Sequence, residues 1–144
     1  MILLTILFLF IASVCDIRAG LVPLWIGPAA VCLRILYLLS YVQNPFLILE
    51  CFLVGGGLFL FYCFFAKYGT LGGMDCIAIL ICGLSIGIYG LYTGILAALL
   101  SIPHILIASK RENKDYPFIP YIFCGFILSL LIMRLQGIMV PLLL

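Results

Sequence analysis

Residues 2–16 read ILLTILFLFIASVCD, an almost unbroken apolar run that ends at Asp16. Apolar and polar residues do not alternate along it, so the pattern favours a helix over a strand. A carboxylate beside hydrocarbon is costly unless it is paired, hydrated or used in catalysis. The run therefore predicts a membrane helix that ends in a candidate functional group.

The composition extends this prediction to the whole chain. Its 144 residues are 67% hydrophobic and 8% charged, whereas soluble domains have roughly 45–50% apolar and about 25% charged residues. A lipid bilayer accepts so apolar an exterior, and water does not. The net charge of +2 comes without a basic stripe, which speaks against a nucleic-acid partner.

Polar residues divide the chain into six apolar segments. Crossing a hydrocarbon core of roughly 30 Å takes about 20 helical residues. We therefore expect an all-α membrane protein with one domain over residues 1–144, a six-transmembrane-helix bundle with short loops. No basic residue precedes the first segment, so we expect it to be a retained helix and not a cleaved signal. The segments cover residues 2–16, 21–42, 45–66, 74–89, 91–109 and 118–141.

Basic residues occur only in alternate connections between these segments. Because cytoplasmic loops carry an excess of Lys and Arg, the first, third and fifth connections are expected in the cytoplasm and both termini outside. Asp16 and Asp75 then lie at the same cytoplasmic end of the bundle. The basic residues of these connections are Arg18, Lys67, Lys110, Arg111 and Lys114.

The second aspartate follows a glycine-rich stretch, Tyr68-Gly69-Thr70-Leu71-Gly72-Gly73-Met74-Asp75. Two neighbouring carboxylates tend to share one proton, so that one removes a proton from water while the other donates one, as in aspartic proteases. Asp75 begins a helix and Asp16 ends one. Helix dipoles therefore lead us to expect Asp75 as the anion and Asp16 as the acid.

These motifs resemble the short form of the type IV prepilin peptidases, which are membrane aspartyl proteases. In that family an Asp-x-Arg is followed by a proline seven positions after the aspartate, like Asp16, Arg18 and Pro23. The second aspartate closes a Gly-x-Gly-Asp motif, which residues 72–75 resemble. A proline-rich segment then begins the last helix, as in residues 117–121.

The resemblance implies an aspartic endopeptidase with Asp16 and Asp75 as the catalytic pair, supported by Arg18, Pro23, Gly72 and Gly73. It implies no metal and no organic cofactor. The expected partner is a prepilin-like membrane protein whose short basic leader is cleaved at the cytoplasmic face, and the expected location is the bacterial inner membrane. The oligomeric state stays open. The cysteine-rich insert of the longer, methylating members is missing.

Three residues depart from the family pattern. Leu24 stands where asparagine is usual, Met74 replaces the second motif glycine, and Ile77 replaces a frequent lysine. One alternative is therefore a catalytically inactive relative that binds pilin-like helices. Another is a small proton-coupled transporter. Transporters often have internal repeats and acids at the midplane, and this chain shows neither pattern.

Other polar residues lie inside the apolar segments. For Arg34, Arg134 and Glu50 we expect one structural ion pair plus one snorkelling arginine. For His104 we expect a hydrogen-bonded histidine of the bundle.

Small residues recur at helical spacing and indicate close packing between helices. The seven cysteines form no CxxC pair and are interpreted as reduced packing residues. The small residues at helical spacing are Gly83, Gly87, Gly90 and Gly94, and the third segment contains Gly55, Gly56 and Gly57.

Overall fold

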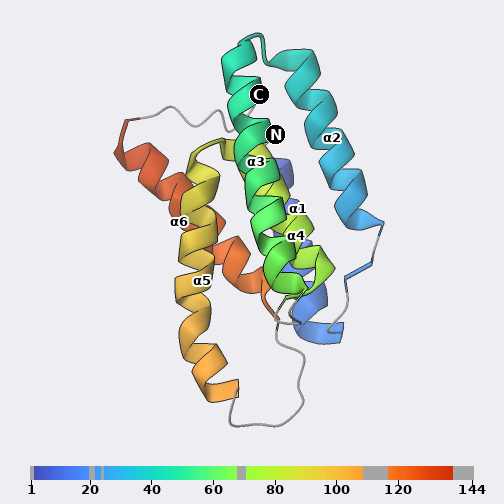
Figure 1. Cartoon of the computed structure of the whole chain (residues 1–144), viewed down its shortest axis with the longest axis vertical. Coiled ribbons are helices and arrows are strands. Elements are labelled where there is room, and N and C mark those ends of the chain that lie inside the picture. The colour runs from blue at the N-terminus through green and yellow to red at the C-terminus, as the bar shows by residue number, and fades with distance from the viewer. Residues whose placement is uncertain (1, 20–21, 24, 68–70, 109–116, 138–144) are drawn as a thin grey trace.

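The computed structural model describes residues 2–19, 22–23, 25–67, 71–108 and 117–137. These residues form six α-helices and no strand, which confirms the all-α prediction (Figure 1). The segments expected at 21–42 and 118–141 form shorter helices. The helices are α1 (Ile2–Ala19), α2 (Ile26–Tyr41), α3 (Pro45–Ala66), α4 (Gly73–Ile86), α5 (Tyr89–Ala108) and α6 (Ile119–Leu135).

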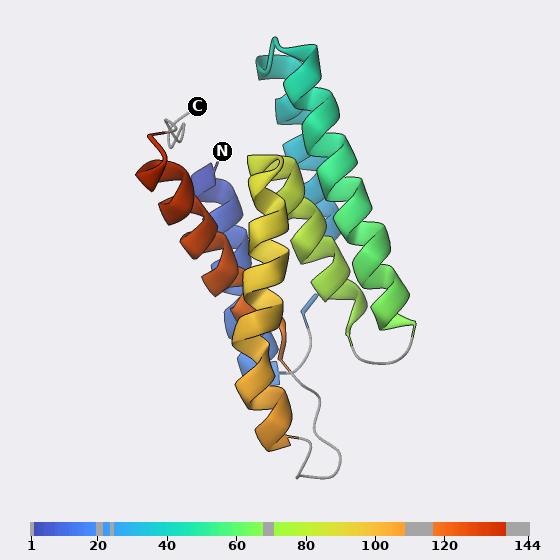
Figure 2. The same ribbon diagram turned by 60° about the vertical axis from the view of Figure 1, so that its left-hand side comes forward.

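Successive helices run in opposite directions. The C-terminal end of α1 and the N-terminal ends of α4 and α6 therefore lie at the same end of the bundle, the lower end in Figures 1 and 2. We call it the site end, because it holds both Asp16 in the last turn of α1 and Asp75 in the first turn of α4. The alternation of helices thus brings the two aspartates to one end, as expected.

The short helix α4 is the centre of the bundle. It packs against each of the other five helices, and ten of its 14 residues are buried. At 1.5 Å per residue it is only about 21 Å long. Protein, not lipid, therefore surrounds most of the helix that carries Asp75.

Glycines allow three helices to approach one another closely. A Cβ atom on Gly83 of α4 would lie 2.5 Å from the Cα of Gly55 in α3. A Cβ atom on Gly90 of α5 would lie 2.6 Å from the Cα of Gly83. These contacts confirm close packing at Gly55, Gly83 and Gly90, whereas Gly56 and Gly57 have open space beside them.

The turn between α4 and α5 is held by two charged side chains. Gly87 has a φ of +54°, a conformation that side-chain-bearing residues rarely adopt, and it ends α4 there. Arg34, which is 7% exposed, donates from Nε to the Leu84 carbonyl at 3.1 Å and from Nη2 to the Ser85 carbonyl at 3.0 Å. The orphan carbonyls at the end of α4 thus receive a side-chain donor.

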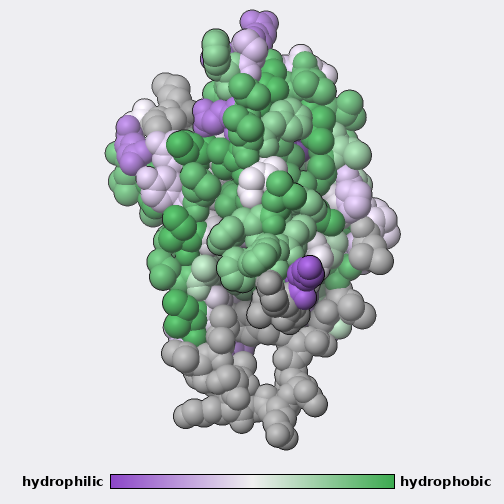
Figure 3. All heavy atoms as spheres, in the orientation of Figure 1, coloured by the Kyte–Doolittle hydropathy of each residue, from purple (hydrophilic) through white to green (hydrophobic). Residues whose placement is uncertain are grey.

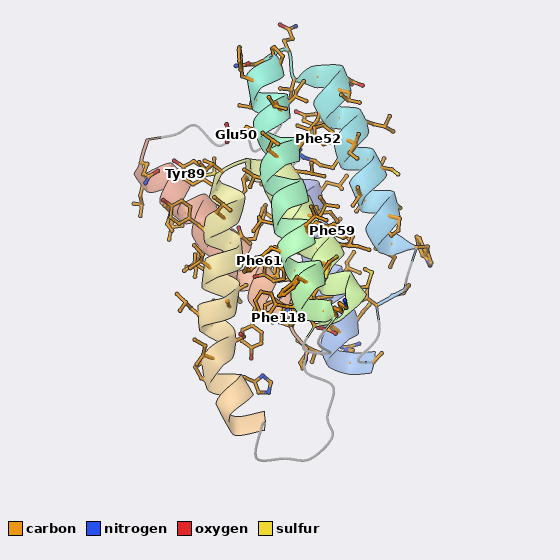
Figure 4. All side chains as sticks on the ribbon, viewed as in Figure 1. Glu50, Phe52, Phe59, Phe61, Tyr89 and Phe118 are labelled. Atoms are coloured by element: carbon orange, nitrogen blue, oxygen red, sulfur yellow. The ribbon has the colours of Figure 1, made fainter. Side chains whose placement is uncertain are left out.

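Glu50 accepts a hydrogen bond from the Ile88 backbone N–H at 2.8 Å, just before α5 begins. The expected ion pair between a buried arginine and Glu50 is therefore wrong: Arg34 and Glu50 each bind the backbone of the same turn. Glu50 lies toward the end of the bundle opposite the site end (Figure 4). Arg134 is exposed in the last turn of α6.

Two helices, α1 and α3, are long and apolar enough to cross a membrane, and the shorter α2, α4 and α6 are also apolar. Their surface fits that environment. Large hydrophobic side chains are exposed along α1, α2, α3, α5 and α6, and the face over α3 and α5 is predominantly apolar (Figure 3). By length and composition alone, two helices among the described residues could cross a membrane, fewer than the six spans expected from the sequence.

Candidate active site

Asp75 is held by the backbone that starts its own helix. Its Oδ2 atom accepts a hydrogen bond from the Gly72 N–H at 2.8 Å, and the Asp75 N–H donates to the Gly72 carbonyl at 3.1 Å. This reciprocal pattern satisfies backbone groups that the first turn of a helix leaves open. The side chain is 6% exposed. The carboxyl group is thus oriented by Gly72 and enclosed by the bundle.

Asp16 is half-buried in the last turn of α1. Its Oδ2 atom accepts a hydrogen bond from the backbone N–H of Ile119, the first residue of α6, at 3.3 Å. The positive end of the α6 dipole therefore faces this carboxyl group. For Asp16 the sequence offered the dipole of α1 alone, whereas each carboxyl group lies at a helix N-terminus in the structure; the roles of Asp75 as anion and Asp16 as acid stay a prediction.

The two aspartates are 59 positions apart in the sequence and are brought to one end of the bundle by α1 and α4. Helices α1 and α4 are in contact, and the Asp16 carboxyl group lies close enough to act electrostatically on Asp75. Farther along the same helix pair, Thr5 and Ser85 are joined by a buried hydrogen bond of 2.9 Å. Direct packing and this polar contact together fix α1 relative to α4.

Tyr62 of α3 is a further residue beside the pair, and no sequence motif pointed to it. It is 5% exposed, and its hydroxyl donates to the Gly94 carbonyl at 3.0 Å. It interacts electrostatically with Asp75. Its ring centroid is 6.1 Å from that of Phe118, which lies at the start of α6 (Figure 4). Phe118 belongs to the proline-rich segment that was singled out in the sequence. The sequence therefore pointed to the start of α6, but it gave no indication of Tyr62.

Two of the residues that depart from the family pattern pack against α2. A Cβ atom on Gly27 would lie 2.9 Å from Cγ2 of Ile77 and 3.0 Å from Cε of Met74. Met74 and Ile77 lie three residues apart, on one face of α4, whereas Asp75 lies about 100° from Met74 around the helix. Gly27 thus leaves space for the two larger side chains on a face other than that of Asp75.

The other predicted site residues lie nearer the surface. Arg18 is exposed in the last turn of α1, and Pro23 is exposed before α2. Gly72 and Gly73 are exposed at the start of α4, where Gly72 provides the N–H that binds Asp75. Leu24, the stretch 68–70 and the basic residues of the fifth connection lie outside the described residues.

His104 of α5 lies toward the site end and its Nδ1 is 2.7 Å from the hydroxyl of Tyr121 in α6. This hydrogen bond confirms the expected role as a bundle histidine. All seven cysteines are free, in agreement with their interpretation as reduced residues. Within the described ranges, no three His, Cys, Asp or Glu side chains are grouped so that they would hold a metal ion.

The chain was compared with known protein families, curated proteins and solved structures. A model of the type IV leader peptidase family matches residues 3–132 of the 144, a range that includes both aspartates. Neither the curated proteins nor the solved structures gave a match.

Proposed function

The chain belongs to the type IV leader peptidase family, and from this premise we propose that it is an aspartic endopeptidase that removes the short basic leader of a prepilin-like protein. Asp16 and Asp75 are the proposed catalytic pair. The observation that carries the proposal is their convergence: two carboxyl groups from helices distant in the sequence lie at one end of the bundle, each hydrogen-bonded to a backbone N–H at a helix N-terminus.

The proposed chemistry needs one negative charge and one proton shared by the pair. The ionised carboxylate removes a proton from water as the water attacks the scissile carbonyl, while the protonated carboxyl donates its proton to the carbonyl oxygen. When the C–N bond breaks, the first carboxyl gives the proton taken from water to the leaving amine, and the second takes a proton back from a hydroxyl of the tetrahedral intermediate, which restores the pair. The positive ends of α4 and α6 stabilise the single charge of such a pair. Burial of Asp75 strengthens these electrostatic interactions, because the surrounding medium is less polar than water.

We also propose that all six helices span the bacterial inner membrane, with the site end toward the cytoplasm. Arg18 and Lys67, at the site end of α1 and α3, agree with the excess of basic residues on that side. Since α4 is about 21 Å long and the hydrocarbon core is about 30 Å thick, α4 crosses the membrane only together with the turns at its ends, and we place Asp75, in its first turn, below the cytoplasmic surface within the bundle. The substrate segment that reaches Asp75 must be extended, because a helix engages its own carbonyl groups in internal hydrogen bonds.

The packing of Met74 and Ile77 against Gly27 supports an active enzyme over an inactive relative. Their larger side chains occupy space beside α2, and Asp75 keeps its hydrogen bond to the N–H of Gly72.

The test co-expresses a prepilin-like protein with one of three forms of this chain, the wild type, Asp16→Asn or Asp75→Asn. The measurement is the rate at which the leader is removed. The two substitutions keep the size of the side chain and remove its charge, so we expect cleavage to fall at least a hundredfold in each. Glu50→Gln is the matched control, because it removes a carboxylate at the opposite end of the bundle and should leave the cleavage rate unchanged. Wild-type rates in either asparagine variant would rule out the pair, and a wild type inactive on several substrates would favour the inactive relative.

A further inference from the structure

A groove of about 760 Å³ runs between α3 and α5. Six positions of α3 from Leu53 to Tyr62 and five positions of α5 from Leu91 to Leu99 line it. Apart from the Tyr62 hydroxyl, all the lining side chains are apolar or glycine. Phe61, which is 58% exposed, projects between the two helices at its edge (Figure 4). The groove is therefore an apolar channel on the side of the bundle, open to the surroundings.

The shape of the groove fits a helix. Each wall is one face of a helix, with lining residues three or four positions apart, and the ten residues of the α3 wall extend over about 15 Å. A Cβ atom on Gly57, within the α3 wall, would meet no atom within 4 Å. Small residues at such a place let a second helix come close, and an apolar helix in an apolar groove is a recurring mode of recognition.

The groove leads to the aspartate pair. Along both walls the residue numbers increase toward the site end, so Tyr62 lies at the end of the α3 wall nearest to it. The Tyr62 ring packs at a centroid distance of 6.1 Å on Phe118, the neighbour of Ile119, whose N–H binds Asp16. The groove therefore ends one aromatic contact away from the start of α6, where Asp16 is bound.

We propose that this groove binds the apolar transmembrane helix of the prepilin-like substrate, with the N-terminal end of that helix beside Tyr62. The proposal rests on the proposed function, because it is the leader before this helix that the enzyme removes. The helix seats in the groove and the unwound segment that precedes it lies between Asp16 and Asp75. A lipid acyl chain fills any apolar hollow, but it has no need of a groove that ends beside the segment that binds Asp16.

Two adjacent glycines provide a matched test. Gly57→Leu places a side chain in the groove, whereas Gly56→Leu places the same side chain on α3 outside it, and neither new Cβ meets an atom within 4 Å. We expect Gly57→Leu to lower kcat/KM for the full substrate at least tenfold, through KM. A soluble peptide with the same leader and cleavage site but no apolar helix should be cleaved at the wild-type rate. Gly56→Leu should change neither reaction.

Binding is tested separately from catalysis with a photo-crosslinking residue, p-benzoylphenylalanine, in the Asp16→Asn background. Placed at Phe61 it should crosslink to the substrate helix, and placed at the similarly exposed Leu36 of α2 it should not. Crosslinks from position 61 to lipid alone, or equal kcat/KM values for the two leucine variants, would overturn the proposal. A crosslink to the substrate at position 61 combined with an inactive wild type would support the groove and reject the peptidase function.

Discussion

The strongest stability prediction concerns Gly83, where α3 and α4 come closest. In Gly83→Ala the new Cβ atom would lie 2.5 Å from the Cα and 2.8 Å from the nitrogen of Gly55. Non-bonded carbon atoms prefer about 3.5–4.0 Å, so the two helices must separate by about 1 Å. Both contacted atoms belong to the backbone, and no change of rotamer relieves the clash. Overpacking of this kind costs typically about 1–3 kcal/mol.

The matched control is Gly56→Ala on α3, one residue after the Gly55 that the new Cβ of Gly83→Ala would meet. Its Cβ atom meets nothing within 4 Å, so it should only gain the roughly 0.5–1 kcal/mol by which alanine is favoured over glycine inside a helix. Gly83→Ala gains the same amount, and the difference between the two variants isolates the overpacking cost. About 1–3 kcal/mol corresponds to an unfolding equilibrium changed about 5- to 150-fold.

The measurement is an unfolding titration with sodium dodecyl sulfate in mixed micelles, followed by circular dichroism. We expect Gly83→Ala to unfold at a lower detergent fraction than Gly56→Ala. Because α3 carries Tyr62, the displacement should also slow leader cleavage. Identical unfolding curves for the two variants would refute the reasoning, since the contact between α3 and α4 would then not be tight.

Two further predictions use the same titration. Arg34→Met removes the side-chain donors to two backbone carbonyls at the end of α4, and it should lower the free energy of unfolding by about 1–3 kcal/mol. Arg34→Lys should recover only part of this loss, because an ammonium group lacks the forked geometry of guanidinium. Wild-type stability of Arg34→Met would contradict this prediction. Thr93→Val keeps the shape of the side chain and removes its 3.0 Å hydrogen bond to Ser129 between α5 and α6. The loss should lower the free energy of unfolding by about 0.6 kcal/mol, the average for such bonds in membrane proteins. A double-mutant cycle with Ser129→Ala measures the coupling energy, and a value of zero would count against the bond.

Much of the site was accessible from the sequence. Asp16 and Asp75 were singled out because charges are costly beside apolar runs, and the alternation of six helices placed them at one end. The glycine before Asp75 was expected to matter, and the N–H of Gly72 does bind its carboxyl group. The proline-rich segment that begins α6 was noticed, but not its contact with Asp16.

The partners of Arg34 and Asp16 were not accessible. The sequence suggested Glu50 as the partner of one of the two arginines because opposite charges attract, whereas the fold gives Arg34 two carbonyls at the end of α4. Asp16 ends α1 in the sequence, yet the packing of α1 on α6 puts it against the Ile119 N–H. An inference from the dipole of α1 alone therefore missed the N-terminus of α6 that faces Asp16.

The sequence by itself determined that this chain is helical, apolar and a leader peptidase relative, because long apolar runs, glycine breaks and two short motifs are local properties. The tertiary structure alone decided that α4 is the buried centre, that Tyr62 lies beside Asp75, and that a groove opens between α3 and α5. The physical reason is that lipid and protein interior are equally apolar. Helix faces that contact lipid and faces that contact protein carry the same residue types, so only the fit between particular surfaces, such as Gly83 on Gly55, selects the arrangement.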